Sequence, residues 1–428
     1  MITRKNWLRF GLLVLAIYTV IRFGILGVQP PGKIPTDLLN FYVGVDRLNA
    51  GELVYQPKDW SPFKYSPTFL VLFSWTFYLL GQKLGWLMWC ALSVLGFAWM
   101  ADWLWRNAFP EQWENRATPK GHRLKGWQLS LLISAFFVFG WHGFIEHFSY
   151  GQGDFLIFTA FLGSVALVEK RRNDAIAALV LSVCLITKPQ SAILLSYFFI
   201  RRKWTLLLSI GVCTVALLFS PALAWGWPRL LELFSQWQFI LQSQSADFLT
   251  GNLNQNLAAS LARLFNEREA VKFLSPMFLG LGAISMMVLT WFWKTPSTMA
   301  PQAVCRLVCV VLMFYSLVSP LSWRWSTFIW IPVGVICSVD AIVSRKRDAL
   351  RDRRSSVVLL VLLGFFALNG LLIQKIIAHR LGIQEVDDLS RVGLYCLGNI
   401  LLFAASCLVL RKYLQRNEKP VSSSNSRD

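Results

Sequence analysis

The chain has 428 residues, of which 55% are hydrophobic and only 15% are charged, and its mean hydropathy is +0.49. Soluble domains carry about 25% charged residues, so this composition excludes an ordinary soluble globular protein. The formal net charge of +19 would indicate nucleic-acid binding in a soluble protein. In a membrane protein it indicates basic loops on the cytoplasmic side, so we expect no nucleic-acid partner.

Apolar runs of roughly 16 to 22 residues recur along the whole chain, and about 20 such residues cross the hydrocarbon core of a bilayer. The sequence therefore predicts an all-α polytopic membrane protein with about twelve transmembrane helices and both termini in the cytoplasm. The predicted spans are residues 7–28, 84–105, 127–147, 154–169, 175–187, 189–200, 205–225, 273–293, 303–322, 324–343, 355–375 and 391–411.

A further apolar stretch, residues 66–80, is assigned by the distribution of charge. If it does not cross the membrane, 27 of the 42 lysines and arginines lie on the cytoplasmic side and 15 on the outer side, as the positive-inside rule requires. If it crossed, the basic clusters at 170–172, 201–203 and 345–354 would all face outward. We therefore predict a re-entrant or interfacial helix for 66–80.

The outer face then receives two long polar segments, residues 29–83 and 226–272. Both contain helix-like patches and tryptophans, which predicts interfacial helices. Residues 1–411 are predicted to form one transmembrane domain, and residues 412–428 a disordered cytoplasmic tail.

The content of motifs limits the possible chemistry. All eight cysteines lie within or beside apolar segments, which indicates packing residues rather than a disulfide framework or a zinc site. The sequence also lacks a glycine-rich nucleotide loop, a metal-binding histidine cluster and a serine-hydrolase motif. We expect no metal and no cofactor.

Asp37 is the first candidate for chemistry, because charged side chains at membrane depth are costly and often functional. It follows the first predicted span and precedes aromatic, amphipathic sequence. A carboxylate beside a dry outer cavity can accept the proton of a sugar hydroxyl as a general base. The alternative is that Asp37 caps the helix that follows it.

A tight turn, Gly151-Gln152-Gly153-Asp154, joins two predicted spans. The amide of Gln152 can both donate to and accept from sugar hydroxyls, and Asp154 beside it is a second polar candidate. The alternative is an ordinary turn in which Asp154 caps the next helix.

Lys188 lies at the tip of a hairpin whose arms, 175–187 and 189–200, are shorter than the roughly 20 residues that cross a bilayer. The tip is therefore expected to lie below the outer surface, inside the protein. A lysine there can neutralise a lipid phosphate. Snorkelling of the side chain to the headgroups is the alternative.

Two later segments carry polar groups suited to a sugar or a phosphate. The carboxamide run 254–256 precedes Arg263, whose planar guanidinium can bind phosphate oxygens. Further along, Arg324 lies between Trp323 and Trp325 at a predicted helix break, which suits phosphate binding and stacking on a sugar. A plain interfacial anchor explains this last segment equally well.

A set of motifs in fixed order extends from residue 37 to residue 323. Its members are Asp37, Tyr42, Gly51, Tyr55, Lys64-Tyr65-Ser66-Pro67, Gly151-Gln152, Lys188-Pro189, Asn254-Gln255-Asn256, Arg263 and Ser319-Pro320-Leu321-Ser322-Trp323. In these residues the sequence resembles glycosyltransferase family 87, the polyprenol-phosphate-mannose-dependent mannosyltransferases of the GT-C superfamily.

The resemblance implies a GT-C fold with a catalytic aspartate in the first outer loop, and Asp37 occupies that position. It implies inverting transfer of a hexose, mannose above all, from a polyprenyl-phosphate sugar to a glycolipid or glycan acceptor. The reaction is expected on the extracytoplasmic face of a bacterial cell membrane. The departing phosphate is expected to bind Lys188, Arg263 and Arg324. The sugar or acceptor is expected to contact Tyr42, Tyr65, Gln152, Asp154, Asn254, Gln255, Asn256 and Trp323.

Two other functions stay open on the sequence. A transporter or flippase of a lipid-linked saccharide would also need many spans and intramembrane charges, although transporters commonly carry an internal repeat and none is visible. A non-catalytic GT-C-like membrane protein is the other, because the family commonly has a histidine shortly after Trp323, where this chain has Arg324.

Overall fold

The computed structural model describes residues 36–56, 63–109, 126–243, 249–251, 254–292, 299–322, 328–347, 353–369 and 394–417. Every extended regular element within these ranges is a helix, which confirms the all-α prediction. In chain order they are α2 (Thr36–Asn49), α3 (Pro67–Ser74), η2 (Tyr78–Leu80), α4 (Gly81–Ala108), α6 (Gly126–Tyr150), α7 (Asp154–Glu169), α8 (Asp174–Thr187), η3 (Pro189–Leu195), α9 (Ser196–Ile200), α10 (Trp204–Phe219), α11 (Ala222–Trp225), α12 (Trp227–Gln242), α14 (Leu257–Leu264), α15 (Ala270–Phe292), α16 (Pro301–Val318), α17 (Trp330–Arg347), α18 (Arg353–Asn369) and α21 (Leu394–Asn417).

Several of these helices fit a membrane. Three described segments are long and apolar enough to cross one: Pro67–Ala108, Trp204–Trp225 and Pro301–Val318. The pair Gly143–Tyr150 and Asp154–Glu169 passes the same test together, although the two helices meet at a bend of 107°. Six shorter apolar helices lie among the rest. The total of twelve spans stays a prediction.

The stretch predicted to be re-entrant or interfacial begins with a short helix. The hydroxyl of Ser66 caps α3 by accepting from the backbone N–H of Phe69, and Pro67 occupies the first turn, where its missing N–H costs nothing. The eight residues of α3 are about 12 Å long, far less than the hydrocarbon core. A turn and η2 then lead into α4.

The helices differ sharply in how much they bury. In α16, 78% of the residues are buried, and this helix packs against α4, α15 and α21. In the most apolar stretch of Trp204–Trp225, only 17% of the residues are buried. Helix α10 packs mainly on α8 and leaves Leu208 and Val212 exposed. Such an apolar, exposed face is what contact with lipid tails requires.

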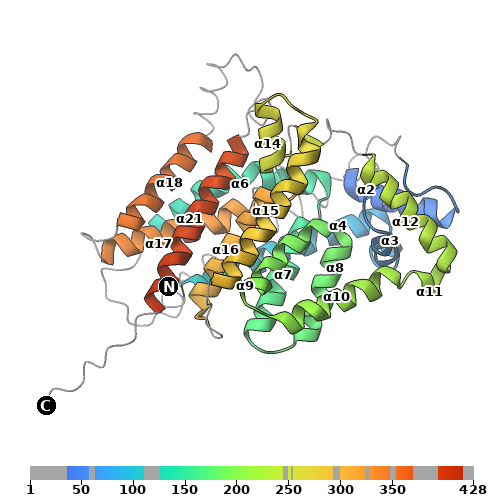
Figure 1. Ribbon diagram of the computed structural model, residues 1–428, viewed down its shortest axis with the longest axis horizontal. Coiled ribbons are helices and arrows are strands. Elements are labelled where there is room, and N and C mark those ends of the chain that lie inside the picture. The colour runs from blue at the N-terminus through green and yellow to red at the C-terminus, as the bar shows by residue number, and fades with distance from the viewer. Residues whose placement is uncertain are drawn as a thin grey trace.

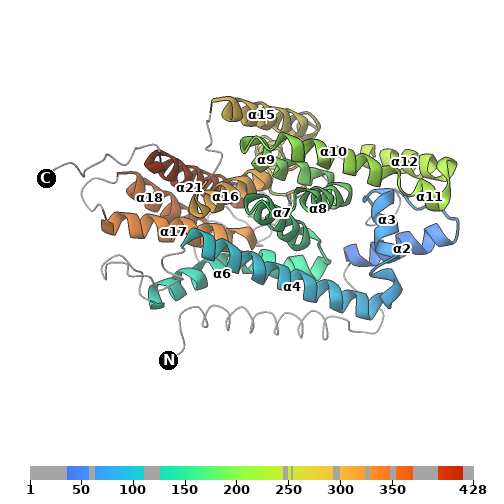
Figure 2. The ribbon, with the colours of Figure 1, turned by 90° about the horizontal axis from the view of Figure 1, so that it is seen from below.

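Helices α2, α3, α11 and α12 gather at one end of the molecule, and α17 and α18 lie at the other (Figures 1 and 2). The two long segments predicted on the outer face meet at the first end. The indole of Trp237 in α12 donates to the carbonyl of Lys64 (2.8 Å), and Arg229 donates to that of Glu52 (3.4 Å). Figure 2 shows α4 running from this end toward the opposite one.

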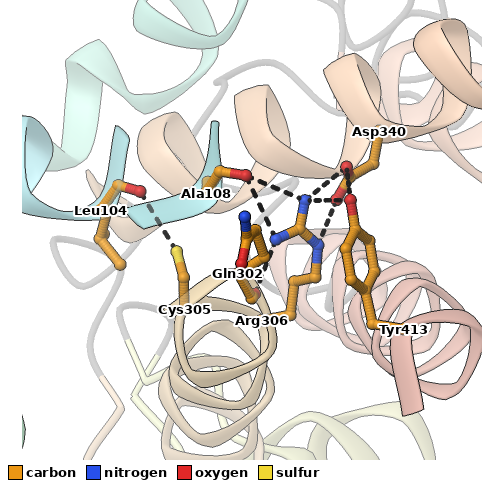
Figure 3. Close-up of polar contacts among 7 residues, drawn as sticks. All are labelled: Leu104, Ala108, Gln302, Cys305, Arg306, Asp340 and Tyr413. Atoms are coloured by element: carbon orange, nitrogen blue, oxygen red, sulfur yellow. Dashed lines mark hydrogen bonds and ion pairs between the residues drawn. The ribbon is translucent and has the colours of Figure 1, made fainter. Parts of the chain in front are cut away.

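A buried arginine ties four helices together at the far end of α4, where it also donates to the carbonyl of Ala108 (3.4 Å) (Figure 3). Arg306 of α16 donates through Nε to Asp340 Oδ2 (2.6 Å) and through Nη2 to Asp340 Oδ1 (2.5 Å) in α17. The same guanidinium lies over the ring of Tyr413 from α21, 3.6 Å from its centroid. We name Arg306, Asp340 and Tyr413 the Arg306 cluster.

Candidate active site

Four predicted candidates from three separate parts of the sequence form one hydrogen-bonded chain. The amide nitrogen of Gln152 donates to Asp37 Oδ2. Lys188 Nζ donates to Gln152 Oε1 (3.2 Å) and to Asp154 Oδ1 (2.9 Å). We name Asp37, Gln152, Asp154 and Lys188 the Asp37 cluster. It joins the first turn of α2, the turn between α6 and α7, and the turn between α8 and η3.

The backbone around Gln152 is fixed on both sides. Its N–H donates to the carbonyl of His147 (3.0 Å), and its carbonyl accepts from the indole of Trp89 (3.2 Å). Gly151 adopts a φ of +72°, a conformation that glycine reaches without the strain of a side chain. The turn therefore presents the Gln152 amide in one orientation, with the nitrogen toward Asp37 and the oxygen toward Lys188.

The two aspartates have side-chain partners that bear on the capping alternative. Asp37 lies inside the first turn of α2, and its carboxylate accepts from the Gln152 side chain. Gly153, rather than Asp154, occupies the cap position of α7, and Asp154 pairs with Lys188. Helix capping therefore does not account for the Asp154 carboxylate, and the Asp37 carboxylate has a side-chain partner in Gln152.

Lys188 is buried with 8% exposure and paired with Asp154. Its backbone N–H donates to Cys184 at the end of α8, and Pro189 starts η3 directly after it. The predicted position inside the protein is confirmed, and snorkelling to headgroups is excluded for this conformation. An ammonium group has three donors, and two of them are used by Gln152 and Asp154.

The environment of Asp37 suits a general base. Burial raises the pKa of Asp37 to about 6. The charges of Lys188 and Lys64 and the hydrogen bond from Gln152 oppose that rise. The carboxylate is therefore ionised at neutral pH and yet more basic than an ordinary aspartate, which is the compromise that proton abstraction favours.

Two residues of the segment before α3 interact electrostatically with Asp37. The ring of Tyr65 packs edge-on against Phe41, 4.7 Å between centroids, and the charge of Asp37 contributes to the rise in the Tyr65 pKa that burial causes. Its hydroxyl therefore stays neutral. Burial lowers the pKa of Lys64 to about 8, against the opposing effect of Asp37. Lys64 was not among the predicted site residues, although it stands next to Tyr65 in the motif.

The predicted sugar contact Tyr42 has a different partner. Its hydroxyl lies 2.9 Å from the carbonyl of Phe77 and 3.0 Å from that of Gly81. A Cβ on Gly85 would lie 2.0 Å from the same hydroxyl, so the contact with α4 requires glycine there. These contacts favour a structural role for Tyr42, which fastens α2 to the start of α4.

The carboxamide run is joined to the later Ser-Pro motif through backbone groups. Asn254 Nδ2 donates to Pro320 O (2.9 Å), and Asn256 Nδ2 donates to Ser319 O (2.9 Å). Asn256 also caps α14, and the Gln255 N–H donates to Ser322 O (2.7 Å). The two segments thus form one unit, but the side chains of Asn254 and Asn256 hold the backbone rather than an open site.

Arg263 is likewise committed to the backbone. Its Nη1 donates to the carbonyls of Thr250, Gly251 and Asn254, and its Nη2 donates to Ser260 Oγ. These contacts favour a structural role over the predicted binding of phosphate. Trp323 and Arg324 lie outside the described residues. Among the described residues, no three histidine, cysteine, aspartate or glutamate side chains are grouped to hold a metal ion.

Comparison with known proteins gives one match. No curated protein and no solved structure is detectably similar to the chain. The sequence model of glycosyltransferase family 87 matches residues 63–320, which is 258 of the 428 residues. The match covers Tyr65 and the Gln152, Asp154 and Lys188 members of the Asp37 cluster, and the chain therefore belongs to glycosyltransferase family 87, a family of membrane glycosyltransferases.

Proposed function

We propose that the protein transfers a hexose, with mannose favoured by the family resemblance, from a polyprenyl-phosphate sugar to a hydroxyl of a glycolipid or glycan acceptor. The observation that carries the proposal is the Asp37 carboxylate, which is held by Gln152, has a pKa of about 6 and lies beside the Lys188–Asp154 pair. The lack of a nucleotide loop supports a lipid-linked donor.

The reaction is a single displacement. Asp37 accepts the proton of the acceptor hydroxyl, and the oxygen attacks the anomeric carbon of the donor sugar. The bond between that carbon and the phosphate oxygen breaks, and its electron pair leaves with the polyprenyl phosphate, so the anomeric configuration inverts. Lys188, with its third N–H donor, stabilises the negative charge that develops on the phosphate.

The proposal places the Asp37 cluster on the extracytoplasmic face of a bacterial cell membrane. The distribution of lysine and arginine supports this orientation, because 27 of 42 fall on the opposite side. The Arg306 cluster then lies at the cytoplasmic ends of the helices.

A transfer assay on the purified protein tests the proposal, with polyprenyl-phosphate mannose, glucose and galactose as donors. Asp37→Asn keeps the shape of the side chain but removes the proton acceptor, so turnover should fall about 100-fold or more. Asp46→Asn is the matched control, because Asp46 lies on the exposed side of the same helix. Wild-type turnover in Asp37→Asn would refute Asp37 as the base, and Asp154 would be the next carboxylate to test.

A further inference from the structure

The segment of Lys64, Tyr65 and Ser66 is held from three directions. The Trp237 indole donates to the Lys64 carbonyl (2.8 Å), the Tyr55 hydroxyl to the Tyr65 carbonyl (2.8 Å), and the Ser66 hydroxyl to Ile186 O in α8 (2.6 Å). These partners come from both long segments and from the bundle. The backbone that carries Lys64 is therefore fixed relative to α8 and α12.

The charges of the Asp37 cluster indicate a role for Lys64 in binding an anionic substrate. Lys188 and Asp154 form a neutral pair, and the Asp37 carboxylate interacts electrostatically with the Lys64 ammonium. An anionic phosphate brought next to a carboxylate base is repelled unless a cation lies between or beside them. Lys64 is half-buried, so its charge is only partly screened by water.

Helix α12 indicates the level of Lys64 relative to the membrane surface. Trp227, Leu231 and Leu241 are exposed by 57%, 58% and 41%, while the charged pair Arg229–Glu232 lies on another side of the helix. A helix with exposed apolar and charged sides fits the membrane interface. Because α12 also carries the indole that donates to the Lys64 carbonyl, an interfacial α12 would bring Lys64 to the level of the lipid headgroups, where the phosphate of a lipid-linked sugar is found.

We propose that Lys64 binds the phosphate of the lipid-linked donor and stabilises it as it leaves, an inference that rests on the proposed function. Its ammonium donates charge-assisted hydrogen bonds to the phosphate oxygens. The stabilisation increases during transfer, because breaking the bond to the sugar adds a negative charge to the phosphate. Lys64, in the segment before α3, and Lys188, in the turn between α8 and η3, then both contact the phosphate.

Binding of a short-chain isoprenyl monophosphate, which has the phosphate and no sugar, tests this directly in protein reconstituted in nanodiscs. Lys64→Gln should weaken binding about tenfold or more, as expected for a charged hydrogen bond. Lys64→Arg keeps the charge and should restore most of the affinity. Lys272→Gln is the matched control, because Lys272 is an exposed lysine paired with Glu269 and should bind as the wild type does.

Wild-type affinity in Lys64→Gln, or an equal loss in Lys64→Arg and Lys64→Gln, would overturn the proposal. Inorganic phosphate should bind at least about tenfold more weakly than the isoprenyl probe, because it lacks the lipid chain. Equal affinity for both would overturn the assignment to a lipid-linked phosphate.

The transfer assay separates this inference from the proposed function. Lys64→Gln should raise the KM for the donor, lower kcat and weaken binding of the isoprenyl probe, whereas Asp37→Asn should lower kcat and leave binding of the probe unchanged. An active Asp37→Asn protein would count against the proposed base alone. Normal donor kinetics in Lys64→Gln together with an inactive Asp37→Asn protein would overturn the inference alone.

Discussion

The two buried ionic clusters lie toward opposite ends of α4 and differ in how fully their polar groups are used. Tyr42, five residues after Asp37, contacts Gly81 at the first residue of α4, whereas Arg306 lies near Ala108 at its last, about 40 Å away along the helix. In the Arg306 cluster every N–H of the guanidinium has an acceptor within 3.4 Å, and the acceptors are Asp340, Tyr413, Gln302 and Ala108 (Figure 3).

The Asp37 cluster is less complete. Among the described residues, Lys188 Nζ has two acceptors for its three donors. Asp37 is half-buried, and the neutral amide of Gln152 lies between the Asp37 carboxylate and the Lys188 ammonium. A fully satisfied ion pair has no capacity left for a ligand and holds helices together. A cluster with spare donors and a partly accessible carboxylate can accept a substrate. The comparison therefore supports the proposal that one end of α4 stabilises the structure and the other carries the chemistry.

The largest expected effect on stability comes from breaking the Arg306 cluster. Arg306→Met leaves Asp340 buried without its partner, which costs about 3–5 kcal/mol. Thermal or chemical unfolding in detergent measures the loss. Arg229→Met is the control, because the Arg229–Glu232 pair lies on the surface and such pairs contribute no more than about 1 kcal/mol. Similar losses in the two variants would remove the distinction between the clusters.

The pH dependence of transfer sharpens the assignment of the base. Turnover should fall as the pH drops through about 6, because protonated Asp37 cannot accept a proton. Lys188 lowers the pKa of Asp37, so Lys188→Gln should shift this acidic limb to higher pH. The double variant Lys188→Gln/Asp154→Asn removes both charges of the pair and should shift the acidic limb less than Lys188→Gln alone. An acidic limb that does not move would show that Lys188 does not act on the base.

The smallest effect is expected for Tyr42. Tyr42→Phe removes one hydrogen bond between α2 and the start of α4 and should cost about 1 kcal/mol of stability. The KM values for donor and acceptor should not change if the contact is only structural. A raised KM with unchanged stability would restore the predicted contact with sugar.

The sequence predicts candidate site residues best where a charged or amide side chain stands at a predicted turn. Asp37, Gln152 and Lys188 were identified because a charge or an amide stands beside a helix end in an apolar chain. The Arg306–Asp340 pair was missed, since both residues lie inside apolar runs and pair across 34 positions between two helices. Nothing in the local sequence tells which charge lies opposite which on a neighbouring helix.

Other differences have a similar origin. The side chains of Asn254 and Asn256 suit sugar hydroxyls and backbone carbonyls equally well, and only the fold shows that carbonyls of residues 319 and 320 lie next to them. Lysines are common in outer segments, so the residue type alone does not mark Lys64 as a site residue. Only the fold shows that Trp237, far along the chain, holds the Lys64 backbone and that Lys64 interacts electrostatically with Asp37.

The central claim is that chemistry belongs to the Asp37 cluster and structural stability to the Arg306 cluster. The most direct measurement compares Asp37→Asn with Asp340→Asn for both unfolding temperature and turnover per folded molecule. We predict that Asp37→Asn keeps its unfolding temperature and loses turnover about 100-fold or more, whereas Asp340→Asn unfolds at a lower temperature and keeps its turnover. Asp37→Asn with a lowered unfolding temperature and wild-type turnover would contradict the account.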